Sequence, residues 1–199
     1  MKLNWVETLV VNNPLRRWHQ VHVEARILED LLAKSFAGGR VLVAGCGRGV
    51  EIELAFRRFG AASVDAFDLD PKQVRRARQR LGHRFGVQAG LWVGDATRIP
   101  VRAARYDAVL DWGVLHHIAD WKAAIREIAR VLVVGGQLLF IEVPGHKIRS
   151  PHYRLLFDHP LEERFEPADF HRACEERGLE VDGRTRSYFG FFFGVAVRR

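Results

Sequence analysis

Apolar residues in this chain gather in short runs, separated by longer segments in which they recur at helical spacing. Five of these runs, each five to seven residues long, have the length of buried strands. They are residues 40–44, 63–68, 88–93, 106–111 and 137–143. Strand-like runs that alternate with helical segments predict a parallel sheet covered by helices on both faces. The expected fold class is therefore α/β, with a doubly wound, Rossmann-like sheet.

The segments between the runs contain signals of helix ends. Asp70 and Pro71 offer an N-cap and a first helical position for an arginine-rich helix that ends at Gly82. A second helix is predicted from apolar residues at helical spacing, which are Trp121, Ala124, Ile125, Ile128 and Leu132. The closing elements are a predicted helix over 168–177 and predicted strands over 179–187 and 191–197.

Two segments lie outside this alternation. Residues 14–34 have an amphipathic helical pattern in front of the first predicted strand. Residues 144–167 contain three histidines and four prolines and are too long for a simple connection. We expect this second segment to form a lid over a substrate. The aromatic run 188–193 fits a buried central strand better than an exposed acceptor pocket or membrane contact.

Length and composition narrow the classes of protein. The 199 residues suffice for one domain with a sizeable core, and 48% of them are hydrophobic, which argues against disorder. No apolar run reaches the length of a bilayer span, and the start at Met1 has no signal-peptide pattern, so a cytoplasmic protein is expected. Two cysteines, Cys46 and Cys174, suggest neither a disulfide framework nor a metal site. The net charge of +7 comes from scattered arginines and favours a solvated surface over a nucleic-acid interface.

The first apolar run ends in three glycines, Gly45, Gly47 and Gly49. Such a turn lets the main chain approach a ligand closely, and the helix that follows directs free N–H groups to the same place. The dinucleotide fingerprint needs its third glycine one residue later, where this chain has Val50, so the spacing favours S-adenosylmethionine. Asp68 ends the second run nineteen residues after Gly49 and is suited to bind a ribose diol.

From these residues the chain resembles the class I S-adenosylmethionine-dependent methyltransferases, within the group that includes the ubiquinone and menaquinone methyltransferases. The resemblance covers roughly residues 40–143 and rests on segments 41–49, 66–78, 94–100, 106–120 and 126–142. It implies a seven-stranded, mainly parallel sheet that closes with an antiparallel C-terminal hairpin. It also implies the following parts of a single domain: an N-terminal helical cap (1–37), a cofactor-binding core (38–143), a substrate lid (144–167) and a C-terminal helix and hairpin (168–199).

The resemblance assigns roles to individual residues. Gly45, Cys46, Gly47 and Gly49 would form the wall against the methionine and ribose, and Asp68 would hold the ribose hydroxyls. Leu69, Asp95 and Ala96 would surround the adenine. Asp111 and Trp112 end the fourth predicted strand beside the sulfonium, where Asp111 is a candidate partner for the methionine ammonium or the acceptor. His116 is the candidate catalytic base, with a packed structural histidine as the alternative.

One departure concerns the first strand, where Val43 replaces an acid that members of the family usually have. Asp111 is a candidate replacement for that charge.

We expect methyl transfer to a small apolar or aromatic acceptor, quinone- or lipid-like, with peripheral membrane contact as an open possibility and no nucleic-acid partner. A second reading makes nucleic acid the substrate, contacted by Arg75, Arg76, Arg78, Arg80 and Arg84. A third makes the chain a non-catalytic partner subunit. The sequence leaves the oligomeric state undetermined.

Overall fold

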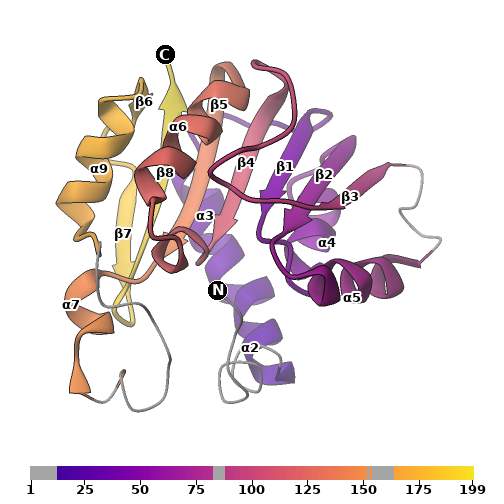
Figure 1. Cartoon of the computed structure of the whole chain (residues 1–199), viewed down its shortest axis with the longest axis horizontal. Coiled ribbons are helices and arrows are strands. Elements are labelled where there is room, and N and C mark those ends of the chain that lie inside the picture. Colours follow the sequence, from indigo (N-terminus) through magenta and orange to yellow (C-terminus); the bar gives the residue numbers. More distant parts are fainter. Residues whose placement is uncertain (1–12, 83–87, 152, 154–163) are drawn as a thin grey trace.

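The structure is a computed structural model that describes residues 13–82, 88–151, 153 and 164–199. Its centre is a sheet with the strand order β3-β2-β1-β4-β5-β8-β6, in which β7 also pairs with β8 (Figure 1). The strands are β1 (Arg40–Ala44), β2 (Ser63–Asp68), β3 (Ala89–Val93), β4 (Tyr106–Trp112), β5 (Leu132–Glu142), β6 (Leu179–Glu180), β7 (Thr185–Tyr188) and β8 (Phe191–Arg198). β1 to β5 are parallel, and β8 is antiparallel to its neighbours. The predicted doubly wound α/β fold is confirmed.

Two strand predictions need correction. The predicted strand 179–187 is divided into β6 and β7, because Asp182 and Gly183 adopt left-handed backbone angles (φ 42° and 67°) and turn the chain. The fifth strand begins at Leu132 and not at Gln137, since Leu132 already pairs with Tyr106 of β4. A register shift follows this pair, in which β5 advances from Leu132 to Gln137 while β4 advances from Tyr106 to Ala108.

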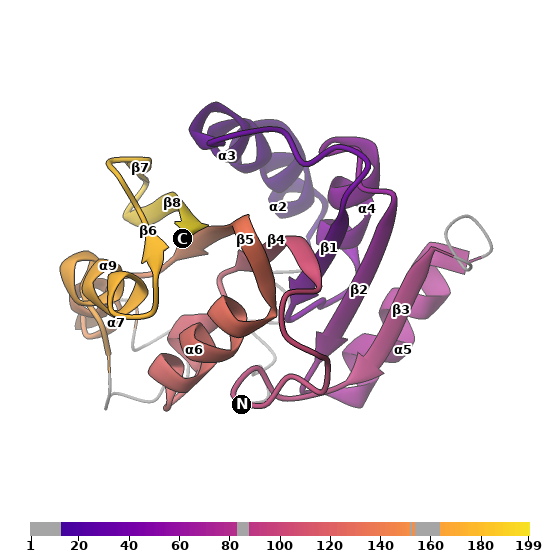
Figure 2. The same cartoon turned by 90° about the horizontal axis from the view of Figure 1, so that it is seen from above.

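Helices cover both faces of the sheet. They are α2 (Pro14–His19), the π-helical turn η1 (Gln20–Glu24), α3 (Ala25–Leu31), α4 (Val50–Arg57), α5 (Pro71–Leu81), the 3-10 turn η3 (Leu115–His117), α6 (Trp121–Val131), α7 (Gly145–Ile148) and α9 (Pro167–Glu175). The predicted cap of α5 is present, since the Asp70 side chain accepts a hydrogen bond from Lys72 N at 2.8 Å. Figure 2 shows α3 and α4 on one side of the sheet and α6 and α9 on the other.

Each face has its own apolar core, as the alternation along the strands requires. In β4, Ala108 and Leu110 pack with α3, α4 and α5, whereas Tyr106 and Val109 pack with α6 and α9. Along β4 this alternation sends Asp111 and Trp112 to opposite faces. Neighbouring residues at the end of β4 therefore lie on different faces of the sheet.

The predicted amphipathic region 14–34 forms a continuous helical segment from α2 through η1 to α3. Figure 1 places α2 beyond the carboxyl ends of β1 and β4. Arg58 fastens this segment to α4, because its guanidinium donates to both carboxylate oxygens of Glu29 (2.6 and 2.7 Å) and to Val21 O (2.6 Å).

The predicted lid is described in part. Its start forms α7, and Glu166 near its end accepts from Arg149 Nη2 at 2.7 Å and pairs with His146 Nδ1 at 2.7 Å. His152 and His159 lie outside the described residues. In the part of the chain that the structure describes, no helix is both long and apolar enough to cross a bilayer.

Candidate functional site

The glycine turn lies at the carboxyl end of β1, between the end of β2 on one side and the end of β4 on the other. Gly45 and Gly47 have positive φ angles of 69° and 47°, which side chains rarely adopt. A Cβ on Gly45 would come within 2.4 Å of Val114 Cγ2, whereas a Cβ on Gly47 would meet nothing within 4 Å. The turn therefore packs tightly on its β4 side and leaves space open above Gly47.

Asp68 at the end of β2 reaches the glycine turn. Its Oδ2 accepts from Gly47 N at 3.0 Å and its Oδ1 accepts from Asp70 N at 2.9 Å. Burial raises the pKa of this carboxyl, while the two backbone donors oppose that rise. The side chain of Leu69 is 56% exposed, a large apolar surface left open to solvent beside the carboxylate. The structure thus brings the predicted ribose ligand and the glycine turn into direct contact.

The end of β3 continues the same edge. Gly94 N donates to Asp68 O at 3.1 Å, which places Gly94 and the following Asp95 next to the end of β2. Asp95 is exposed and its Oδ1 accepts from Thr97 N and Thr97 Oγ1, at 2.8 and 2.9 Å. Ala96, the next residue, is buried. The predicted adenine contacts are therefore adjacent to the predicted ribose contact.

At the end of β4, Trp112 and Asp111 point to different layers. Trp112 Nε1 donates to Glu24 Oε2 of η1 at 2.6 Å, so the tryptophan joins the N-terminal helical segment to the sheet edge. Asp111 is fully buried on the other face, where its charge acts on the Cys174 thiol of α9. Among the predicted site residues, Asp111 is thus separated by the sheet from the layer that holds Trp112.

Asp111 belongs to a buried acid pair that holds the connection after β4. Val114 N donates to both Asp111 Oδ1 and Glu142 Oε1, each at 3.1 Å. Glu142 also accepts from Leu115 N (2.8 Å) and His116 N (3.1 Å), and its Oε2 contacts His116 Nδ1. Burial raises the pKa of both carboxyl groups, and the charge of Glu142 raises that of Asp111 further.

Sequence reasoning did not single out Glu142 as a site residue. A signal was present, because the fifth apolar run ends in this carboxylate just as the second run ends in Asp68. Glu142, at the end of β5, contacts the imidazole of the predicted base His116 and holds it in place.

Two further buried acids on the opposite face were also missed. Glu51, in the first turn of α4, is 8% exposed and accepts from Gln20 Nε2 at 3.0 Å. Glu24 is 3% exposed and contacts Arg16 Nη1 at 2.5 Å and His19 Nδ1 at 3.0 Å. A signal existed here too, since Gln20 and Glu24 continue the helical stripe of buried positions that includes Ile27 and Leu28.

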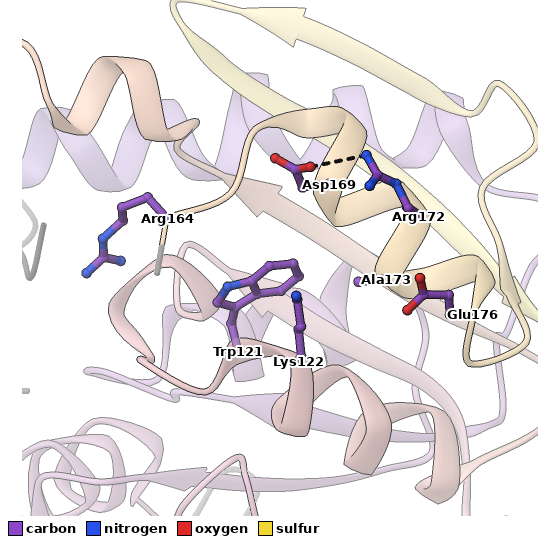
Figure 3. Close-up of a pocket in the computed structure, with 7 residues that line it drawn as sticks. All are labelled: Trp121, Lys122, Arg164, Asp169, Arg172, Ala173 and Glu176. Carbon is purple, nitrogen blue, oxygen red and sulfur yellow. Dashed lines mark hydrogen bonds and ion pairs between the residues drawn. The ribbon is translucent and has the colours of Figure 1, made fainter. Parts of the chain in front are cut away.

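A separate charged hollow is lined by residues of α6 and α9 (Figure 3), the helices that lie across the sheet from α4 in Figure 2. Lys122 Nζ lies 5.4 Å from the centre of the Trp121 ring, and Arg172 pairs with Asp169 at 3.2 Å. Arg164, Ala173 and Glu176 complete the lining. Figure 3 shows the charged ends spread along the hollow, with acids and bases interleaved, and none of the predicted cofactor residues lines it.

The comparisons with known proteins agree with this arrangement. Residues 41–136 match the family model described as a methyltransferase domain. Over these residues, which are just under half of the chain, the sequence is similar to methyltransferase domains. A ubiquinone biosynthesis O-methyltransferase of Xanthomonas oryzae pv. oryzae (strain PXO99A) is 39% identical over 103 residues, which are 51% of this chain and 42% of that protein. A fatty-acid O-methyltransferase of Mycolicibacterium smegmatis is 34% identical over 127 residues, or 63% of this chain and 44% of that protein.

Solved structures share the fold at low identity. A chain in the complex of the Haloferax volcanii Trm112 methyltransferase activator with a putative methyltransferase has a TM-score of 0.77 and 20% identity, covering 92% of this chain and 89% of that one. An S-adenosylmethionine-dependent methyltransferase of Aquifex aeolicus has a TM-score of 0.72 and 18% identity, with 96% and 95% covered. The chain spans less than half the length of the curated relatives described above.

The cofactor of such a methyltransferase domain is S-adenosylmethionine, and the residues at the sheet edge fit it. The ligand of an open α/β sheet binds at the carboxyl ends of the strands where the strand order reverses, here between β1 and β4. The open space above Gly47, the Asp68 carboxylate beside it and the exposed Leu69 lie next to this switch point.

Proposed function

We propose that this protein transfers a methyl group from S-adenosylmethionine to a small apolar or aromatic acceptor that is quinone- or lipid-like. One observation carries the proposal: the open glycine turn at the switch point is hydrogen-bonded through Gly47 N to the Asp68 carboxylate. This arrangement offers backbone close to a ligand and an acid beside it for a ribose diol.

The order of the strands sets how the cofactor would lie along their carboxyl ends. Adenine would lie at the end of β3 against Asp95, Ala96 and Leu69, and the ribose at Asp68. The methionine part would then reach the glycine turn, with Trp112 on its β4 side. In this proposal the segment α2-η1-α3 caps the methionine end and residues 144–167 close over the acceptor.

The chemistry asks little of the protein beyond position. When bound, S-adenosylmethionine supplies an activated methyl group, so the chain's residues align the acceptor and exclude water. An alcohol or phenol acceptor must also lose a proton. His116 would accept it, because contact of its Nδ1 with Glu142 holds the imidazole in place.

The apolar acceptor is supported by the names of two relatives and by exposed apolar side chains. One relative is named for ubiquinone biosynthesis and another for fatty acids. Leu15 and Trp18 of α2 are 73% and 55% exposed, and Phe189 between β7 and β8 is 79% exposed. With the net charge of +7, these side chains suit contact with an anionic lipid surface that would hold such an acceptor.

The test is calorimetric titration with S-adenosylmethionine and S-adenosylhomocysteine. We expect micromolar binding by the wild type and a loss of about a hundredfold in Asp68→Ala, because the carboxylate would accept two hydroxyl hydrogen bonds. Asp68→Asn tests the charge with nearly the same shape, and Asp30→Ala, at an exposed position on α3, serves as the control. Wild-type protein that binds neither ligand would contradict the proposal and favour a non-catalytic partner subunit.

A further inference from the structure

Two buried carboxylates lie near the glycine turn, and the proposed function gives neither of them a role. Glu51 and Glu24 come from different elements, α4 and η1, yet the charge of Glu24 acts on Glu51. The charge of Glu51 in turn acts on the Cys46 thiol inside the turn. Trp112 Nε1 holds Glu24 at the end of β4. Both acids therefore border the switch point between β1 and β4.

The two acids differ in how their charge is balanced. Glu24 contacts the guanidinium of Arg16 and the ring of His19, and it accepts from Trp112. Glu51 accepts a hydrogen bond from a neutral group, the amide of Gln20, at 3.0 Å, and the charge of Arg16, which is paired with Glu24, also acts on it. A buried carboxylate is costly unless a positive group accompanies it, and burial accordingly raises the pKa of Glu51 to about 7. Because Arg16 is in contact with Glu24, a further cation at Glu51 would stabilise the ionised form of that carboxyl.

Val43 of β1 shows what surrounds Glu51 on this face of the sheet. This residue is fully buried in the same apolar cluster as Val50 and Ile52 of α4, on the face that Glu51 adjoins. Val43 therefore gives this layer an apolar side chain at β1. The first turn of α4 follows Gly49 directly, so the carboxylate of Glu51 comes from the helix that begins at the glycine turn.

We propose that the Glu51 carboxylate binds the positively charged amino group of the cofactor's methionine part, with Gln20 of the cap holding the carboxylate in place. The assignment rests on the proposed function, which directs the methionine end to the glycine turn. In this proposal Glu51 binds the ammonium in place of Asp111, the candidate from the sequence. Asp111 lies on the opposite face of the sheet, beside Glu142. Charge-assisted hydrogen bonds of an ammonium to a buried carboxylate are among the strong ones.

The decisive experiment compares two ligands that differ in the amino acid end. S-adenosylhomocysteine carries the ammonium, whereas 5′-methylthioadenosine keeps the adenosine and sulfur without it. We expect Glu51→Gln to weaken calorimetric binding of S-adenosylhomocysteine by about tenfold to a hundredfold and to leave that of methylthioadenosine within about twofold. Glu53→Gln, two residues along α4 and paired with Arg17 and Arg80 at the surface, is the matched control and should change neither.

The pH dependence provides a second readout. Because the ammonium binds the ionised carboxylate, wild-type affinity for S-adenosylhomocysteine should fall about fivefold from pH 7 to pH 6, as Glu51 takes up a proton. Arg16 and Glu24 from the cap and Cys46 from the turn also face this carboxylate. Glu51→Gln retains those groups, so any slope that they or His19 cause would persist in it, and the fivefold slope should vanish.

Three results would overturn the assignment. If the affinity of Glu51→Gln for S-adenosylhomocysteine is within twofold of the wild-type affinity, the carboxylate does not bind the ammonium. If circular dichroism shows that Glu51→Gln folds and its affinity for both ligands falls equally, Glu51 shapes the turn and does not bind the ammonium. Wild-type protein that binds neither ligand would remove the proposed function, and this assignment with it.

Discussion

At the scale of single residues, Glu142 connects more groups than any of the site residues expected beforehand. It accepts backbone hydrogen bonds from Val114, Leu115 and His116 and also contacts the His116 ring. These contacts fix the turn after β4 and the imidazole together. A histidine held in this way can act on an acceptor with little rearrangement.

We predict that His116→Ala lowers turnover of a phenol or quinol acceptor by about a hundredfold or more, the scale of general-base catalysis. Glu142→Gln should lower turnover by about tenfold to a hundredfold, since it keeps a polar group of the same size but removes the charge that orients the ring. Single-turnover methyl transfer would measure both.

The affinity for S-adenosylhomocysteine separates this role from a structural one. It should stay within about threefold of wild type in both variants, because the proposed cofactor contacts include neither residue. His146→Ala, an exposed histidine of α7, is the control. Full turnover in His116→Ala would assign the histidine to packing alone.

At the scale of elements, β8 is unusual in lying between β5 on one side and both β6 and β7 on the other. Gly194 of β8 faces Phe140 of β5 across the antiparallel pair. A Cβ at Gly194 would come within 2.2 Å of Phe140 Cζ. The aromatic ring thus lies over the glycine backbone, and the strand pairing requires that no side chain is there.

Gly194→Ala should therefore destabilise the fold by about 1 to 3 kcal/mol, the usual range for overpacking a core. Chemical denaturation would measure it. In a double-mutant cycle, Phe140→Leu should recover part of that loss because it removes the ring atoms that the new methyl meets. Additive effects in the two variants would show that the clash is relieved elsewhere.

At the scale of the whole molecule, the cap and the C-terminal strands come together at one end. The rings of His19 and Tyr188 stack with their centres 5.8 Å apart. Lys147 of α7 donates to Phe189 O at 2.9 Å. Elements from the start, the middle and the end of the chain thus meet beside the carboxyl edge, where Trp18 and Phe189 are exposed.

We predict that the pair of substitutions Trp18→Ala and Phe189→Ser lowers binding to vesicles of phosphatidylglycerol and phosphatidylcholine by about tenfold or more, from the apolar area that would leave the lipid. Co-sedimentation would measure the bound fraction. Val134→Ala removes an exposed apolar side chain near the start of β5, at the opposite end of the strand from the carboxyl ends, and should not change vesicle binding. Equal binding by wild type and the double variant would exclude this surface.

How far the sequence could predict the fold depends on the kind of interaction. The strands β1 to β4 and the helices α5, α6 and α9 fall within about two residues of their expected bounds, because apolar periodicity and capping residues are local signals. The break between β6 and β7 was missed, although Asp182 and Gly183 are turn residues, because the apolar and β-branched residues around them favoured one strand.

The sequence by itself determined the α/β class, the glycine turn and the carboxylate at the end of β2, since each follows from spacing along the chain. The tertiary structure alone decided which face of the sheet each acid serves. Asp111 and Glu51 are both acids near a strand or helix end, yet strand alternation and the cap place them in different layers with different partners. Burial and neighbouring charge set the chemistry of a carboxylate, and both arise from contacts between residues far apart in the sequence.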